Sequence, residues 1–167
     1  RVAVEAAREK VAALLGAKPR EIVFTGCGTE SDNMALRGVL AAEAKTGSHI
    51  VTTAIEHPAV IETCAYLETR GVEVTYVPVG RSGVIDPDDV AESIRDDTVL
   101  VSVMHGNNES GSVQPIAEIA KLVKEREKIF HTDAVQTAGK LPIDVEEMNI
   151  DLLALSGTLS IDHHVAV

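Results

Sequence analysis

The first candidate for chemistry is a glycine-containing turn at residues 25–31, which reads Thr-Gly-Cys-Gly-Thr-Glu-Ser and opens a predicted helix. Glycine lets the backbone approach an anion closely, and the free N–H groups of a helix start favour a phosphate there. The turn matches neither the G-x-G-x-x-G dinucleotide pattern nor a Walker loop. The residues alone leave two interpretations open: a phosphate site, or an ordinary turn in which Thr29 or Ser31 caps the helix.

A histidine occupies the second position of interest. His57 follows the predicted strand 49–54 and directly precedes the helix-opening Pro58. Imidazole titrates near neutral pH, so a ring at this place could shuttle protons or stack on a planar ligand. The alternative is that His57 is simply a polar side chain of a loop.

Polar groups also follow two further predicted strands. The segment 105–111, His-Gly-Asn-Asn-Glu-Ser-Gly, comes after the strand 98–104, and Asp133 and Gln136 come after the strand 129–132. The asparagines could merely hold a turn through side-chain hydrogen bonds. A carboxylate at the end of a buried strand costs desolvation free energy unless a cation or donor pairs with it. Asp133 therefore stands out from the acids on predicted helix faces.

The elements that must position these groups alternate along the chain, which predicts βαβ units. The predicted strands are 21–24, 49–54, 72–79, 98–104, 129–132 and 151–156, and the predicted helices are 1–15, 29–45, 58–69, 88–95 and 115–128. We expect a three-layer α/β fold with a mainly parallel sheet covered by helices. Four strand ends that deliver polar groups to one sheet edge are typical of a ligand site.

Composition excludes several classes of protein. The 167 residues are 45% hydrophobic and 25% charged, which indicates one globular domain. The formal net charge of −11 disfavours nucleic-acid binding, and no apolar run approaches the roughly 20 residues that cross a bilayer. Cys27 and Cys64 form neither a zinc spacing nor a disulfide framework, and the adjacent His163 and His164 would point to opposite faces of a strand. We therefore expect a cytoplasmic chain that binds no metal, nucleic acid or membrane.

Five segments follow one another along the chain: FTGCGTESDN, AIEHPAV, MHGNNESG, HTDAVQTAGKLPIDV and DLLALSG. In this order they resemble the NifS/IscS group of cysteine desulfurases, in the class V aminotransferase family. Related class V members, including the SufS-like desulfurases and selenocysteine lyases, differ at the first and third segments. The resemblance runs from about Glu21 to Gly157 and implies most of the large domain of a fold-type I enzyme that uses pyridoxal 5'-phosphate. Residues 1–157 are the predicted cofactor-binding part.

The resemblance implies a phosphate end for this site. Gly28 and Thr29 resemble the pair that cradles the cofactor phosphate, in agreement with the anion argument made from the turn. Ser156 resembles the serine that closes the phosphate cup, and Gly157 directly follows it.

The resemblance implies a ring end as well. His57 resembles the imidazole that stacks on the pyridine ring and assists proton transfer. Asn108 and Gln136 resemble contacts to the ring 3-hydroxyl group. Asp133 resembles the carboxylate that pairs with the protonated pyridine nitrogen, and that protonation makes the ring an electron sink.

The positions after Gly157 depart from the family pattern. The family has His and then the Lys that forms the Schiff base with the cofactor, whereas this chain has Thr158 and Leu159. Leucine has no amine, and Lys140 belongs to a different segment. We expect residues 158–167 to be a divergent tail and the family's small C-terminal domain to be absent. We hypothesise a frameshifted, truncated or wrongly joined reading frame, which the nucleotide sequence of this region would test.

The activity implied by the resemblance is the removal of sulfur from L-cysteine, which gives alanine and an enzyme-bound persulfide for iron–sulfur cluster assembly. Family enzymes are homodimers, and an iron–sulfur scaffold protein accepts the sulfur. We expect this chain alone to be inactive, because Leu159 occupies the lysine position and the persulfide cysteine is missing. The alternatives are a non-catalytic remnant or binding domain with the same fold, and another class V aminotransferase.

Overall fold

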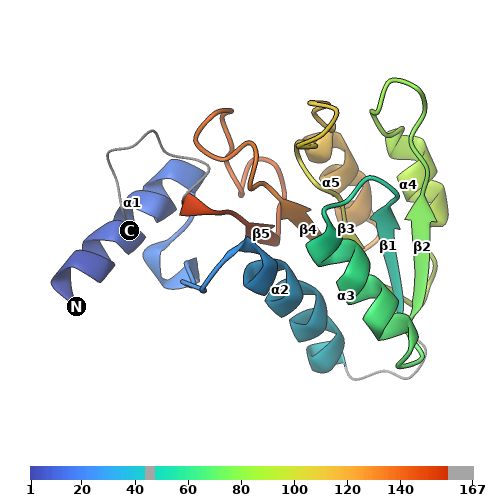
Figure 1. The fold of residues 1–167 in the computed structure, drawn as a ribbon, viewed down its shortest axis with the longest axis horizontal. Helices are drawn as coiled ribbons and strands as arrows, with labels where there is room; N and C mark the ends of the chain where they lie inside the picture. Colours follow the sequence, from blue (N-terminus) through green and yellow to red (C-terminus); the bar gives the residue numbers. More distant parts are fainter. Residues whose placement is uncertain (44–47, 158–167) are drawn as a thin grey trace.

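The core of this protein is a sheet of five parallel strands, seen in a computed structural model that describes residues 1–43 and 48–157 (Figure 1). The strands are β1 (His49–Thr53), β2 (Glu73–Val77), β3 (Thr98–Ser102), β4 (Ile129–Asp133) and β5 (Leu152–Ala154). Their order is β2-β1-β3-β4-β5, and each pair of neighbours is parallel. The predicted α/β architecture with a parallel sheet is confirmed.

Helices cover both faces of the sheet (Figure 1). They are α1 (Val2–Leu15), the short 3-10 helix η1 (Pro19–Glu21), α2 (Gly28–Glu43), α3 (Pro58–Glu68), α4 (Pro87–Ser93) and α5 (Ile116–Glu125). Buried residues of α2 and α3 cluster with Ile50 and Leu100, whereas those of α4, α5 and the end of α1 cluster with Val51, Val101 and Phe130. Neighbouring residues of one strand thus enter different clusters, as the alternation of side chains across a sheet requires.

Proline and a side-chain cap together explain where two helices begin. The His57 side chain accepts the Ala59 N–H at the start of α3, and Pro58 fills the first helical position. The Asp86 side chain likewise accepts the Asp88 N–H at the start of α4, and Pro87 fills the first helical position. A proline at this place has no N–H that would need an acceptor. Both helices therefore begin at residues determined by the local sequence.

The predicted strand 21–24 is wrong. Residues 22–25 pair with no strand in the described part of the chain. The Arg8 guanidinium donates to the Ile22 carbonyl oxygen and lies 4.9 Å from the centre of the Phe24 ring. The segment is apolar and β-branched, but its carbonyl group and its aromatic ring are engaged by a helix side chain instead of a neighbouring strand.

Predicted helix ends move by less than a turn. α4 ends at Ser93, because the backbone of Ile94 is extended. α5 ends at Glu125, shortly before Glu127 adopts a left-handed backbone with a φ of 56°. Residues 44–45, the last two of the predicted helix 29–45, lie outside the described residues.

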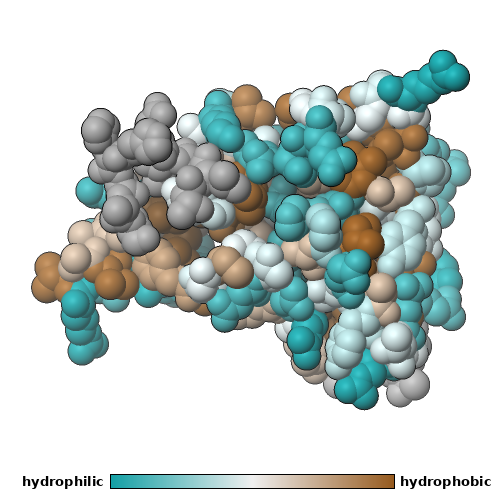
Figure 2. All heavy atoms as spheres, in the orientation of Figure 1, coloured by the Kyte–Doolittle hydropathy of each residue, from teal (hydrophilic) through white to brown (hydrophobic). Residues whose placement is uncertain are grey.

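Apolar side chains are exposed on α1. Val2, Val4 and Leu14 are 87%, 46% and 50% exposed, and Figure 2 shows apolar atoms (brown) gathered at this end of the molecule. Such patches commonly mark a contact surface. Among the described residues, no helix combines the length and apolar character needed to cross a membrane.

The chain reverses its direction of progress across the sheet between β1 and β3. From β1 it passes outward to the edge strand β2, then returns beyond β1 to β3 and continues through β4 to β5. In open parallel sheets, ligands bind beyond the carboxyl ends of the strands at such a reversal. This edge of the sheet therefore positions the site.

Candidate functional site

His57 lies beyond the carboxyl end of β1 and belongs to the start of α3. Its Nδ1 accepts the Ala59 N–H at 3.1 Å, so a neutral ring carries its proton on Nε2. The side chain is exposed. His57 thus has one nitrogen fixed by the helix and one available for proton exchange.

Asp133 is the last residue of β4 and is 5% exposed. Its Oδ1 accepts the Val135 N–H at 2.9 Å, which fixes the carboxylate. Burial raises the pKa of Asp133, whereas the Val135 N–H and the nearby His57 act to lower it. The structure therefore brings His57 and Asp133 into one electrostatic environment, in which a cationic ligand would offset the burial of the acid.

The glycine-containing turn lies next to Asp133. A Cβ on Gly28, the first residue of α2, would lie 3.1 Å from Cγ2 of Val135. The N–H of Gly26 donates to a carboxylate oxygen of Glu30. The turn thus places an anion-binding N–H group near the carboxyl end of β4.

Asn107 holds the loop that follows β3, just before the predicted ring contact Asn108. The Asn107 side chain donates to the Ile55 carbonyl oxygen at 2.9 Å and accepts the N–H groups of Glu109 and Ser110 at 2.9 and 2.8 Å. The interpretation as a turn held by an asparagine therefore applies to Asn107. Asn108 is exposed, so its amide is accessible to a ligand.

Gly106 brings Gln136 next to this loop. A Cβ on Gly106 would lie 2.5 Å from Cγ2 of Thr137 and 3.8 Å from Cβ of Gln136. His105 Nδ1 and the Thr137 hydroxyl lie 2.8 Å apart and form a buried hydrogen bond between the same two segments. The half-buried Gln136 therefore lies beside the loop that carries Asn108.

We expect Gly106→Ala to destabilise the chain by about 2 kcal/mol, because overpacking a filled site costs about 1–3 kcal/mol. Thr137 cannot withdraw without breaking its hydrogen bond to His105. Urea unfolding measures the change. Gly38→Ala is the matched control: Gly38 is an exposed α2 residue with no atom within 4 Å of an added Cβ, so alanine should stabilise by about 0.5–1 kcal/mol. Equal midpoints for Gly106→Ala and the unmodified chain would contradict the prediction.

Ser156 and Gly157 follow β5 at the same edge. Ala154 of β5 pairs with Asp133 of β4, so the two residues come just after the strand that borders the Asp133 strand. Residues 158–167, which include the predicted lysine position, lie outside the described residues.

A hollow of about 570 Å³ opens between α2 and α3, within the range of roughly 300–1,000 Å³ found for ligand pockets. Thr29, Asn33 and Arg37 line it from α2, and the chain from His57 to Tyr66 lines it from α3. The Arg37 guanidinium lies 5.3 Å from the centre of the Tyr66 ring. One predicted phosphate contact and the predicted ring contact thus line the same hollow.

Three buried titratable residues near this edge are not among the predicted site residues. Burial, followed by the charges of Asp133 and Glu56, raises the pKa of Asp32 to about 8. Burial raises the pKa of Glu56 to about 8, against the effect of its hydrogen bonds. Burial lowers the pKa of His131 to about 4. A layer of groups that favour their neutral forms therefore lies below the exposed site.

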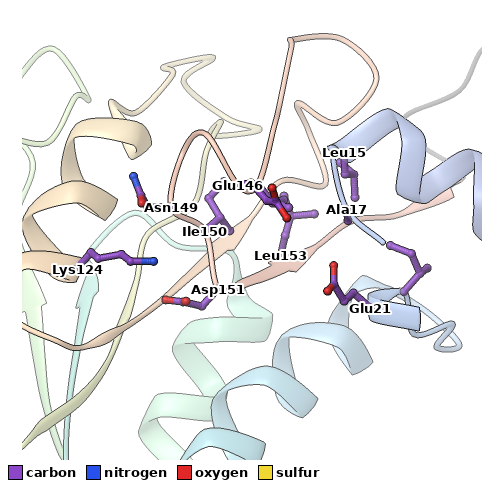
Figure 3. Close-up of a pocket in the computed structure, with 11 residues that line it drawn as sticks. Leu15, Ala17, Glu21, Lys124, Glu146, Asn149, Ile150, Asp151 and Leu153 are labelled. Atoms are coloured by element: carbon purple, nitrogen blue, oxygen red, sulfur yellow. The ribbon is translucent and has the colours of Figure 1, made fainter. Parts of the chain in front are cut away.

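A second hollow, of about 450 Å³, lies near the amino end of β5 (Figure 3). Side chains from the end of α1, from η1, from α5 and from the segment before β5 line it, including Leu15, Glu21, Lys124 and Asp151. Asp151 also accepts the Phe130 N–H at 2.9 Å. None of the predicted site residues lines this hollow, which lies at the opposite end of β5 from the candidate site.

Sequence comparison identifies the family. Residues 1–158 match the family described as Aminotransferase class-V. The chain belongs to the class V aminotransferase family. Two cysteine desulfurases named IscS are similar to it: the protein of Dictyoglomus turgidum is 53% identical over 156 residues, and that of Methanosarcina thermophila is 54% identical over 155 residues. Each match covers 93% of this chain but only 40% and 38% of those relatives, so this family member spans about two fifths of their length.

Solved structures share the fold of this class V family member. The structure described as "SspA in complex with cysteine" has a TM-score of 0.91 at 46% identity and covers 93% of this chain and 45% of that one. A "NifS-like protein" has a TM-score of 0.87 at 45% identity and covers 91% of this chain and 42% of that one. The chain therefore has the fold-type I architecture of the cysteine desulfurases.

Proposed function

We propose that this chain is the cofactor-binding part of a cysteine desulfurase, with pyridoxal 5'-phosphate as cofactor and L-cysteine as substrate. The observation that carries the proposal is the placement of His57 and Asp133 at one sheet edge, beside the start of α2. The names of the relatives, and the similarity to SspA in complex with cysteine, support the same reaction.

The residues present fit this cofactor at both of its ends. Gly28 and Thr29 begin α2, and the free N–H groups and the dipole at a helix start favour an anion such as a phosphate. At the other end, the buried Asp133 is the partner that a protonated pyridine nitrogen requires. Asn108, Gln136, Ser156 and Gly157 complete the proposed contacts.

Each of two side chains has a definite task in the proposed reaction. When bound, the cofactor withdraws electrons from the substrate carbon framework. Asp133, held by the Val135 N–H, would stabilise the positive charge on the ring. His57 would exchange a proton at Nε2, because its Nδ1 already accepts the Ala59 N–H.

The cysteines in the described residues do not suit the sulfur-accepting step. Cys64 is fully buried, and burial raises the pKa of its thiol to about 12, so it stays protonated. Cys27 is exposed, but it belongs to the proposed phosphate turn. With Leu159 at the lysine position, a second candidate function is cofactor binding without turnover.

Partners and location follow from the family resemblance. We propose that the desulfurase to which this cofactor-binding part belongs is a homodimer that passes sulfur to an iron–sulfur scaffold protein in the cytoplasm. The exposed apolar residues Val2, Val4 and Leu14 on α1 support a contact surface on this chain.

Binding and turnover can be measured separately. We expect the purified chain to bind pyridoxal 5'-phosphate in a calorimetric titration, but to release no more sulfide from L-cysteine than free cofactor does. Thr29→Ala should weaken binding about tenfold, since a hydrogen bond to a charged group contributes about 1.5 kcal/mol. Ser93→Ala, at the half-buried end of α4 on the opposite face of the sheet, is the matched control and should leave affinity unchanged.

One result would contradict the proposed cofactor site, and another would contradict the expected inactivity of the chain. Undetectable binding of pyridoxal 5'-phosphate would mean that the candidate site is not a cofactor site. Sulfide release clearly above that of free cofactor would show that an amine other than one at position 159 serves the reaction.

A further inference from the structure

A row of polar side chains crosses the sheet below the candidate site. Thr52 of β1 pairs in register with Ser102 of β3, and Ser102 pairs with His131 of β4. All three are 0% exposed. His131 and Asp133 stand two residues apart on β4, so both point to the same face of the sheet. The row therefore underlies Asp133 and separates it from the apolar cluster around Leu100.

Asp32 of α2 meets this row from above. Its Oδ1 lies 3.6 Å from Nε2 of His131, and the side chains are 2% and 0% exposed. Neither atom has a hydrogen-bond partner within the described residues. On the other side of the ring, His131 Nδ1 lies 2.9 Å from the Ser102 hydroxyl oxygen. A buried oxygen and nitrogen that face each other in this way would repel unless a proton lies between them.

The surrounding charges decide which of the two groups carries that proton. The acids that act on Asp32 are Asp133 at the end of β4 and Glu56 after β1, and no lysine or arginine of the described residues acts on it. His57 acts on Asp133 from the far side of the site. An ionised Asp32 would thus be a buried anion beside two other acids, and a protonated His131 would be a fully buried cation. Burial disfavours both charged forms, as the raised pKa of Asp32 and the lowered pKa of His131 indicate.

We propose that Asp32 is a positioning residue: its carboxylic acid stays neutral and directs its proton toward His131 Nε2, and His131 donates from Nδ1 to the Ser102 hydroxyl. Because these three side chains are all neutral, no second negative charge lies near Asp133. Asp133 can then ionise when a cation binds beside it. The part of the inference that concerns the cation rests on the proposed function, whereas the neutral pair does not.

Nuclear magnetic resonance of the labelled chain tests the pair without cofactor. At pH 6 we expect the side-chain carboxyl carbon of Asp32 at the position of a protonated acid. We also expect His131 with an unprotonated Nε2 and a protonated Nδ1. An ionised Asp32 or a proton bonded to His131 Nε2 would overturn the proposal. Loss of cofactor binding alone would count against the proposed function and not against the pair.

Asp32→Asn provides the matched variant, because its amide N–H can replace the acid as the donor to His131. If Asp32 is neutral, this substitution changes no charge, so the titration midpoint of the Asp133 carboxyl carbon should stay where it is in the unmodified chain. If Asp32 is ionised, the substitution removes an anion and the Asp133 midpoint must fall, which would overturn the proposal. The measurement on the unmodified chain decides the matter even where the variant fails to fold.

Discussion

Replacing Asp133 by alanine is expected to weaken the binding of pyridoxal 5'-phosphate about 100-fold. Asp133 is 5% exposed, and its carboxylate is fixed by the Val135 N–H at 2.9 Å. Removing one partner of a buried ion pair costs about 3 kcal/mol or more, because the remaining charge is left without compensation. Calorimetric titration of the purified variant with the cofactor measures the loss.

Two comparisons separate the loss of charge from the loss of structure. Asp133→Asn keeps an oxygen that can accept the Val135 N–H but has no charge, so it should lose most of the affinity while inorganic phosphate binds as before. Asp88→Ala removes an exposed acid of α4, on the opposite face of the sheet, and should bind the cofactor normally. Unchanged cofactor affinity in Asp133→Ala would mean that the ring nitrogen is not held by this carboxylate.

The sequence predicts most of the fold because its local signals agree with each other. Apolar β-branched runs form the five strands, and Pro58 lies where a helix begins. The run 21–24 carries the same signal as the strands, but strand formation also needs a neighbour with which to pair. That neighbour is a tertiary property, which a local pattern cannot report.

The part of the candidate site that lies at the strand ends could also be predicted from the sequence. His57, Asp133 and Gln136 follow strands, and strand ends of a parallel sheet meet at one edge. The residue-by-residue roles come from the family resemblance. Which of the two asparagines holds the loop could not be predicted, since only the structure reveals that the Asn107 amide reaches the Ile55 carbonyl oxygen.

The buried titratable residues below the site were not predicted, because they occupy positions where the hydrophobic pattern leads one to expect apolar residues. Asp32 shares the buried face of α2 with Leu36 and Val39, so an apolar residue would be expected at its position. His131 stands inside a buried strand, two residues before Asp133. The sequence does show an acid, Asp32, at a position where the helical pattern predicts an apolar residue. Its role cannot be predicted locally, because its partner His131 belongs to another element.

The largest effect on stability is expected for Glu56→Ala, at about 3 kcal/mol. Glu56 is 7% exposed, and its Oε1 accepts the Thr53 hydroxyl at 2.7 Å and the Met104 N–H at 2.9 Å. Alanine leaves both buried donors without an acceptor, and each such group costs about 1–3 kcal/mol. Urea unfolding at pH 6 measures the change.

Glu56→Gln should instead stay within about 1 kcal/mol of the unmodified chain, because its amide oxygen can accept both hydrogen bonds and the acid is itself protonated. Burial raises the pKa of Glu56 from 4.5 to about 8, so the folded chain holds a proton that the unfolded chain releases. This contribution to stability is complete below pH 4.5 and is lost as the pH rises to about 8, by at most about 1.4 kcal/mol per pH unit. Glu56→Gln should show a shallower decline, because only the contribution of the buried Asp32, whose pKa is also raised to about 8, then remains. Glu118→Gln, an exposed change on α5, should retain the full decline. A glutamine variant as unstable as the alanine variant would mean that the ionised carboxylate is what the fold requires.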